Sequence, residues 1–138
     1  MLFEVWAESV PEKLKSDPLW NSKYYQLGMY LYDMVWEDCN KLKKDFRGLE
    51  VSRQLVRSAG SICANMEEAY GRGLGTADHV RILRISLGEA RETQGWYLRA
   101  RHLLPPDILE RRLDVIGQII ALLVTSISTQ SRKIKKKS

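Results

Sequence analysis

The sequence predicts an all-α protein: an antiparallel up-and-down four-helix bundle with a short N-terminal arm and a basic C-terminal tail. Four long segments carry apolar residues at helical spacing, and glycine or proline residues separate them. No segment alternates apolar and polar residues in the manner of a strand. The 138 residues suffice for one domain with a single core, and short loops between long helices favour antiparallel neighbours.

The composition indicates a soluble, intracellular chain. Hydrophobic residues make up 44% and charged residues 28%, no run approaches about 18 consecutive apolar residues, and no secretory signal opens the sequence. Cys39 and Cys63 lie too far apart for a metal-type pair, and two cysteines make no disulfide framework. We expect a cytoplasmic protein with reduced, core-filling thiols and no membrane partner.

The predicted domain boundaries give an arm over residues 1–16, a bundle over 17–131 and a disordered basic tail over 132–138. The arm is apolar enough to form one or two amphipathic turns around Pro11. The sequence does not decide whether it docks on the bundle or on a neighbouring molecule.

The first helix is predicted from Asp17, a cap residue followed by proline, to about Lys44. Its inward face carries Trp20, Tyr24, Leu27, Leu31, Val35 and Leu42. A second apolar stripe, Tyr25, Met29, Tyr32 and Trp36, follows at helical spacing. One core does not require both stripes, so the second indicates a subunit interface.

The second helix is predicted over residues 49–70, after Gly48. Its core face carries Val51, Leu55, Ala59, Ile62, Met66 and Ala69. Gly60, Ser61 and Ala64 lie on another side, where such small residues suit the close approach of another helix better than contact with water.

The third helix is predicted over residues 77–104, because the glycine-rich run 71–75 ends the second helix and Thr76 is a suitable N-cap. Its core face carries Val80, Leu83, Leu87, Ala90, Tyr97, Leu98 and Leu104. A separate arc about 80° wide on a 100° wheel holds Arg81, Arg84, Gly88, Arg91, Gly95, Arg99 and His102, and no acid. The glycines leave space between the guanidinium groups, so a polyanion could approach the helix and each arginine could bind a phosphate in a bidentate way. The alternatives are a basic face exposed to solvent, or arginines that pair with acids of a neighbouring subunit.

The fourth helix is predicted over residues 107–131, after the break at Pro105 and Pro106. Its apolar residues cover about 200° of the wheel, well beyond the roughly 100° of a surface helix. This excess predicts a homo-oligomer. The candidate interface residues are Tyr25, Met29, Tyr32, Trp36, Gly60, Ala64, Val115, Ile119 and Leu122.

Charge is unevenly distributed along the chain. Residues 1–40 hold three basic and seven acidic residues, a net charge of −4, which leaves +9 for the rest of a chain whose net charge is +5. A basic balance of this kind points to an anionic partner, although a basic tail can also serve only to keep a chain soluble. The candidate nucleic-acid-binding residues are Arg81, Arg84, Arg91, Arg99, His102, Arg132, Lys133, Lys135, Lys136 and Lys137.

The sequence lacks the residue patterns of common enzymes. His79 and His102 lie at opposite ends of one predicted helix, and no HExxH, Cys-x-x-Cys or GxSxG motif occurs. The run 71–75 follows a helix and lacks the Gly-Lys-Ser/Thr of a P-loop, and no Glu-x-x-His pair could build a di-metal site. We therefore expect no catalytic residues, metal or cofactor.

The segment from Gln54 to Arg72 resembles the signature of a family of bacterial four-helix bundle proteins. These are encoded in intervening sequences of large-subunit rRNA genes and are similar to the accessory variability determinant proteins of diversity-generating retroelements. The matching residues are Arg57, Ser61, Ile62, Asn65 and Glu68, with Ala69 where glycine is commoner, and Gly88 and Glu92 in the third helix. The likeness covers about residues 20–128.

The resemblance implies a homopentameric barrel with a basic surface. In the retroelement setting such a barrel binds nucleic acid and a reverse transcriptase during mutagenic copying of template RNA, whereas the rRNA-encoded members have no settled activity. Arg57, Asn65 and Glu68 are then either helix–helix fasteners or ligand contacts.

The leading hypothesis is a non-enzymatic, oligomeric accessory protein that binds RNA or DNA through its basic surface and assists a reverse transcriptase. The alternative is a protein–protein interaction scaffold encoded in an rRNA intervening sequence. A third hypothesis is a small-ligand site in the channel of the pentamer.

Overall fold

The computed structural model describes residues 1–137, which are all-α and contain no strand. The α-helices are α1 (Phe3–Glu8), α2 (Glu12–Lys15), α3 (Lys23–Leu42), α4 (Phe46–Gly71), α5 (Ala77–Arg99) and α6 (Pro106–Lys137). Two short 3-10 helices, η1 (Pro18–Asn21) and η2 (Ala100–His102), complete the list. The all-α prediction is confirmed. Ser138, the last residue of the predicted tail, lies outside the described residues.

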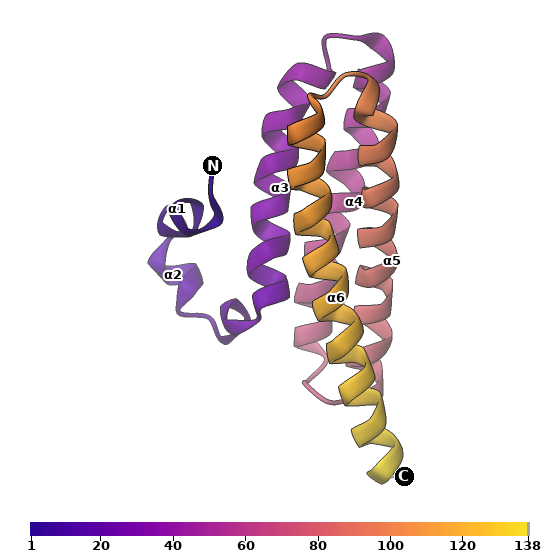
Figure 1. Cartoon of the computed structure of the whole chain (residues 1–138). Helices are drawn as coiled ribbons and strands as arrows, with labels where there is room; N and C mark the ends of the chain where they lie inside the picture. Colours follow the sequence, from indigo (N-terminus) through magenta and orange to yellow (C-terminus); the bar gives the residue numbers. More distant parts are fainter. Residues whose placement is uncertain (138) are drawn as a thin grey trace.

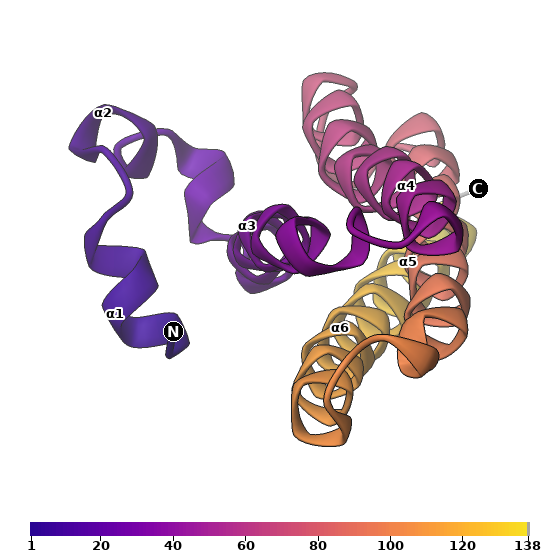
Figure 2. The same ribbon diagram turned by 90° about the horizontal axis from the view of Figure 1, so that it is seen from above.

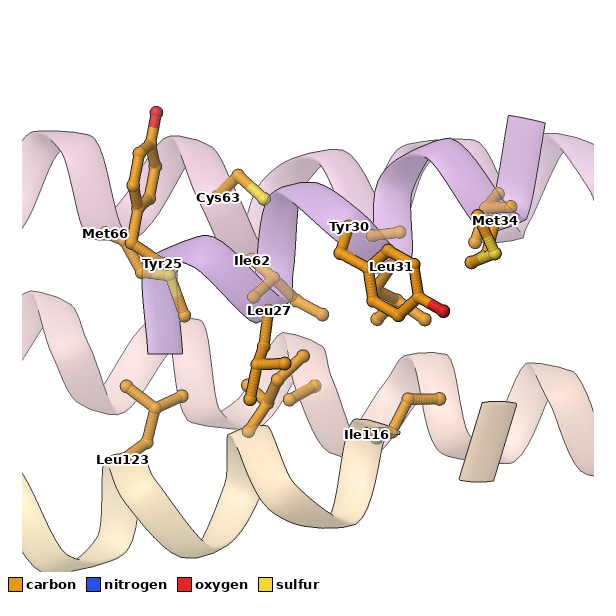
Figure 3. Close-up of a cluster of buried hydrophobic side chains, with 14 of the residues drawn as sticks. Tyr25, Leu27, Tyr30, Leu31, Met34, Ile62, Cys63, Met66, Ile116 and Leu123 are labelled. Atoms are coloured by element: carbon orange, nitrogen blue, oxygen red, sulfur yellow. The ribbon is translucent and has the colours of Figure 1, made fainter. Parts of the chain in front are cut away.

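The four long helices lie side by side around one apolar core (Figure 1). Helix α4 packs against α5, α5 against α6, α6 against α3 and α3 against α4, so the contacts close a ring that is seen from above in Figure 2. Fully buried side chains from all four helices fill its centre, among them Leu31, Ile62, Leu83, Ile116 and Leu123. Figure 3 shows side chains from three of these helices converging there.

The first long helix begins later than predicted. The Asp17 carboxylate accepts a hydrogen bond from the Leu19 amide at 2.9 Å, and this cap starts the 3-10 turn η1 rather than an α-helix. Ser22 then has extended backbone angles, so α3 begins at Lys23. Asp17 and Pro18 are a helix start, as predicted, but of a shorter element.

The sequence predicted that Gly48 separates two helices. Instead, Gly48 lies buried in the first turn of α4. Asp45 is the N-cap, and its carboxylate accepts hydrogen bonds from the backbone amides of Arg47 and Gly48. A β-carbon at position 48 would overlap the Leu42 carbonyl and lie 2.7 Å from Leu103 Cδ1. The glycine is therefore needed for the close approach of two chain segments.

The predicted third helix divides into α5 and η2. Leu98 lies within α5, next to the fully buried Tyr97, but is itself 53% exposed. The prediction that Leu98 belongs to the core face was wrong, whereas Val80, Leu83, Ala90, Tyr97 and Leu104 are buried.

Residues 132–137 continue α6 instead of forming the disordered tail that the sequence predicted. Ile134 is half-buried against the core, and the Gln130 side chain accepts a hydrogen bond from the Gly75 amide at 3.1 Å. Lysine is a good helix former, and positive charges at a helix C-terminus interact favourably with the helix dipole. These contacts explain why a polar, basic segment remains helical.

The arm docks on its own bundle, which decides between the two predicted alternatives. Trp6 is buried, and its indole N–H donates to the Asp33 carboxylate of α3 at 2.7 Å. The ring of Phe3 meets Tyr30 edge-on with centroids 5.5 Å apart, and Trp6 lies 6.1 Å from Trp20. An aromatic cluster therefore joins α1 and η1 to α3.

The candidate interface residues differ in how far they are exposed on the single chain. Tyr25 and Ile119 are buried within the chain, so they are core residues and their assignment to an exposed interface was wrong. Gly60 accommodates Tyr32 of the same chain, because a β-carbon there would lie 3.3 Å from the Tyr32 ring. Trp36 is 66% and Leu122 37% exposed, Ala64 is exposed, and Met29, Tyr32 and Val115 are half-buried.

Helix α6 is long and apolar enough to cross a membrane by length and composition. The sequence expectation missed this because Gln118, Thr125 and other uncharged polar residues interrupt the consecutive apolar run without adding charge. Such a helix is weak evidence for a membrane span, since the core helix of a soluble protein meets the same criterion. Here Ile116, Ile119 and Leu123 are fully buried against the other helices, while 22% of the apolar window is buried in all.

Candidate nucleic-acid interface

A basic groove runs between α5 and α6 and has a volume of about 650 Å³. Its lining residues are Arg84, Leu87, Gly88 and Arg91 from α5, and Val124, Ile127, Ser128, Ser131, Arg132 and Lys135 from α6. We call this feature the α5–α6 groove. It brings two arginines of the predicted stripe beside two basic residues of the predicted tail.

The α5–α6 groove has a cationic lining above an apolar floor. Leu87, Val124 and Ile127 supply the apolar side chains, and the four basic residues lie along the same length of both helices. None of the described residues that line the groove is acidic. The guanidinium groups of Arg84, Arg91 and Arg132 therefore meet no carboxylate side chain among the described lining residues.

Arg84 is held in position by α6. Its guanidinium donates a hydrogen bond to Ser131 Oγ at 3.2 Å, which leaves its other N–H groups for a ligand. Within residues 1–137, Arg91 and Arg132 have no hydrogen-bond or ion-pair partner. Gly88, between Arg84 and Arg91, leaves open space where a side chain would project. The guanidinium groups of Arg91 and Arg132 are therefore available to an anion in the groove.

Arg81 lies on the same stripe but is compensated. Its guanidinium forms an ion pair with Asp78 at 2.7 Å, and Asp78 also pairs with Arg72 at 3.0 Å. The two arginines lower the pKa of Asp78, with the Arg81 hydrogen bond as the largest cause. The stripe contains no acid, as predicted, yet an acid one turn away reduces the positive charge available at this end.

Arg99 and His102 lie at the other end of the bundle, away from the groove. Together with Arg47 they line a separate small pocket of about 130 Å³. The Arg99 guanidinium stacks over the Trp96 ring at 4.5 Å, and Gly95 makes room for it, since a β-carbon there would lie 3.2 Å from Arg99 Nη1. The predicted stripe is therefore divided between two sites.

The remaining basic residues of the tail lie beyond the groove. Lys133 and Lys137 line a hollow beside Leu74 and Gly75 of the loop between α4 and α5. Lys136 is exposed. The whole segment is presented on a helix that continues past the rest of the bundle (Figure 1).

Apart from Gly88, the residues of the family motif do not line the groove, and two of them join helices. Arg57 of α4 forms ion pairs with Glu89 and Glu92 of α5, at 3.4 Å for Glu89. The Trp96 indole donates to Glu92 at 3.0 Å, which extends this network along α5. Arg57 and Glu92 therefore act as helix–helix fasteners in the structure.

The other motif residues bond within α4. The Asn65 amide donates to the carbonyl and the hydroxyl of Ser61, at 2.8 and 3.0 Å. Glu68 pairs with Arg72 at 2.6 Å, one turn along the helix. These contacts give the three residues a structural role at the end of α4.

Sequence reasoning missed a buried ion pair between Asp38 of α3 and Arg112 of α6. The Arg112 guanidinium donates to both carboxylate oxygens at 2.8 and 2.9 Å, and the Tyr97 hydroxyl donates to the same carboxylate at 2.7 Å. Burial is the main cause that raises the pKa of Tyr97, so its hydroxyl remains a donor. The only signal in the sequence was a charged residue at core spacing in each helix.

Within residues 1–137, no group of three or more His, Cys, Asp or Glu residues could hold a metal ion. His79 is buried, with Nδ1 2.7 Å from the Ala69 carbonyl. Burial is the main cause that raises the pKa of Cys63 to about 12, so its thiol stays protonated and unreactive at neutral pH.

Comparison with known proteins places these features in context. A family model described as 23S rRNA-intervening sequence protein matches residues 21–124. A solved structure from Bacteroides thetaiotaomicron VPI-5482, described as a protein of unknown function from the S23 ribosomal protein family, has a TM-score of 0.69 and 24% sequence identity. The match covers 76% of this chain and 95% of that chain, and it indicates a shared fold. No curated protein matches the chain.

Proposed function

Because this chain belongs to the 23S rRNA-intervening sequence protein family, whose name supplies no activity, we propose a function from its geometry: a non-enzymatic, cytoplasmic protein that binds nucleic acid through the α5–α6 groove. The observation that carries this proposal is the convergence of Arg84, Arg91, Arg132 and Lys135 on one groove, with no acidic side chain among the described lining residues. Guanidinium groups bind phosphate in a bidentate way, and positive charge confined to a groove raises the local concentration of polyanions.

The groove suits a phosphate backbone more than base recognition. None of the described residues that line it offers an aromatic ring on which bases could stack, and its cations come from two neighbouring helices, α5 and α6. We therefore expect weak sequence preference and a strong dependence on salt, because each neutralised phosphate releases counterions. RNA and DNA are both compatible with this chemistry. The family description contains the term rRNA, and we therefore use RNA in the test.

We also propose that α3–α6 form an antiparallel up-and-down bundle that assembles as a homo-oligomer, with the pentamer that the resemblance implies as the expected size. Short connections between consecutive long helices support the bundle. The exposed apolar side chains of Trp36 and Leu122 support the assembly. Five copies would carry a formal net charge of +25, which favours polyanions further.

The second candidate function is a protein–protein interaction scaffold encoded in an rRNA intervening sequence. The apolar floor of Leu87, Val124 and Ile127 favours it, since an acidic amphipathic helix would bury its apolar face there and pair its acids with the arginines. The more specific role of assisting a reverse transcriptase rests on the resemblance. Co-purification of such a partner after nuclease treatment would support either protein-binding role.

Fluorescence anisotropy with a labelled single-stranded RNA tests the nucleic-acid proposal. Reversing the charge in Arg84→Glu plus Arg91→Glu should weaken binding at least tenfold and lower the slope of log K against log salt by about 2. Arg111→Glu is the matched control, because Arg111 is exposed on α6 but does not line the groove. Equal losses in the control and the double variant, or no RNA binding at low salt, would exclude the groove.

A further inference from the structure

A second hollow, at the junction of the arm with α3 and α4, has the opposite chemical character to the α5–α6 groove. It has a volume of about 360 Å³, and its walls include the aromatic side chains of Trp20, Tyr25 and Tyr70. Asp17 and Glu67 also line it, and none of the described lining residues is a lysine or arginine. In a chain with a net charge of +5, this is an acidic pocket with aromatic walls.

The walls of this hollow are fixed by contacts from three elements. Trp20 of η1 meets Tyr25 edge-on, with ring centroids 6.3 Å apart, and both residues are buried. The Tyr25 hydroxyl donates to Glu67 Oε2 at 2.7 Å, which joins α3 to α4. The Asp17 carboxylate is oriented by its hydrogen bond from the Leu19 amide. The pocket is therefore formed before any ligand arrives.

Both carboxylates act on the same phenol. Burial is the first cause that raises the pKa of Tyr25, and Glu67 and Asp17 raise it further. The hydroxyl consequently stays protonated and keeps donating to Glu67. No other side chain within residues 1–137 binds the second carboxylate oxygen of Glu67, so that oxygen is available to a cation.

We propose that this hollow binds an alkylammonium group, the cation shared by lysine side chains and polyamines. The aromatic side chains pack against the alkyl chain, their faces attract the positive charge, and the two carboxylates neutralise it. A phosphate would be repelled by the same carboxylates. The hollow and the α5–α6 groove would then bind opposite charges, so this inference is independent of the proposed function.

Titration of the full chain by isothermal calorimetry tests the proposal with two probes. N-acetyl-lysine N-methylamide represents a lysine side chain of a protein partner, and spermidine represents a free polyamine. We expect saturable binding at millimolar or lower concentration. Binding of both probes supports a lysine source, and binding of spermidine alone supports a polyamine. The Nε-acetylated lysine probe, which has no charge, should not bind.

Variants distinguish this pocket from general attraction to acids. Glu67→Gln should weaken binding about two- to fivefold and can still accept the Tyr25 hydrogen bond. Tyr70→Leu should weaken it by a similar factor through loss of the aromatic wall. Glu110→Gln, an exposed acid of α6 outside the hollow, is the control and should leave binding unchanged. Absence of binding by both charged probes, or equal weakening by Glu67→Gln and Glu110→Gln, would overturn the proposal.

Discussion

At the scale of single residues, the close approach of α3 and α4 depends on a glycine. Gly48 lies where α4 begins beside the end of α3, and a β-carbon there would overlap the backbone carbonyl of Leu42. Backbone atoms cannot move aside as flexible side chains can. This position therefore determines how the two helices join.

Gly48→Ala should lower the free energy of unfolding by about 2 kcal/mol or more, because the added methyl group forces α3 and α4 apart. Gly117→Ala is the control, since Gly117 is exposed in α6 and has open space at its β-carbon. That change should raise stability by about 0.5–1 kcal/mol through helix propensity alone. Urea denaturation of both variants measures the difference, and similar effects in the two would contradict the packing argument.

The buried thiol of Cys63 should make stability depend on alkaline pH. Its pKa is about 12 in the folded chain, chiefly because of burial, against about 9 for an exposed thiol. Between these values the unfolded state loses a proton that the folded state keeps, so the free energy of unfolding falls as pH rises, by up to about 1.4 kcal/mol per pH unit. Below pH 8 the group is protonated in both states and contributes no pH dependence.

Cys63→Ala should therefore reduce the steepness of this loss between pH 9 and 11. The pKa values of Tyr25 and Tyr97 are also raised mainly by burial. These two phenols should therefore still make the free energy of unfolding of the variant fall above pH 10. Denaturation midpoints at pH 8, 9.5 and 11 give the comparison. If the wild type and the variant lose stability in parallel, the thiol does not carry the effect.

At the scale of elements, the end of α6 differs most from expectation. The tail looked disordered because its charge is dense and its apolar content is low. Its anchors are Ile134 and the hydrogen bond from Gly75 to Gln130, which joins positions 55 residues apart in the sequence. Long-range contacts of this kind cannot be read from a local pattern.

Removal of residues 132–138 should reduce the helical circular dichroism signal per molecule by about six residues' worth. It should leave the melting temperature within a few degrees, since the described part of this segment contributes only the half-buried Ile134 to the core. It should also weaken RNA binding, because Arg132 and Lys135 leave the groove. An unchanged helical signal per molecule would instead indicate that the segment is not helical in solution. A variant with Lys136→Gln alone serves as the control for loss of charge outside the groove.

At the scale of the whole molecule, the exposed apolar surface is the feature that one chain does not explain. Trp36 is two-thirds exposed on α3, whereas Trp6 and Trp20 are buried. Trp36→Lys should shift the molecule toward the monomer mass in multi-angle light scattering. Phe46→Lys is the control, because Phe46 is more exposed but is not among the candidate interface residues. A wild-type mass equal to one chain would contradict the proposed assembly.

The sequence predicted the four long helices well because apolar spacing and caps are local properties of the chain. Asp45 and Thr76 are cap residues in the structure, and Thr76 was identified in advance. The α5–α6 groove was only half predicted. Arg84 and Arg91 share a stripe by simple periodicity, whereas their approach to Arg132 depends on how two helices pack. The Asp38–Arg112 pair was missed for the same reason, since 74 positions separate its members.

The distribution of charge across the fold has a consequence for how the molecule meets other molecules. The acidic first 40 residues form the arm and most of α3, while the basic groove lies between α5 and α6 on another side of the bundle (Figure 2). The protein is therefore an electric dipole as well as a cation. In the field of a polyanion it should rotate before contact so that α5 and α6 lead, which raises the fraction of productive collisions at low salt.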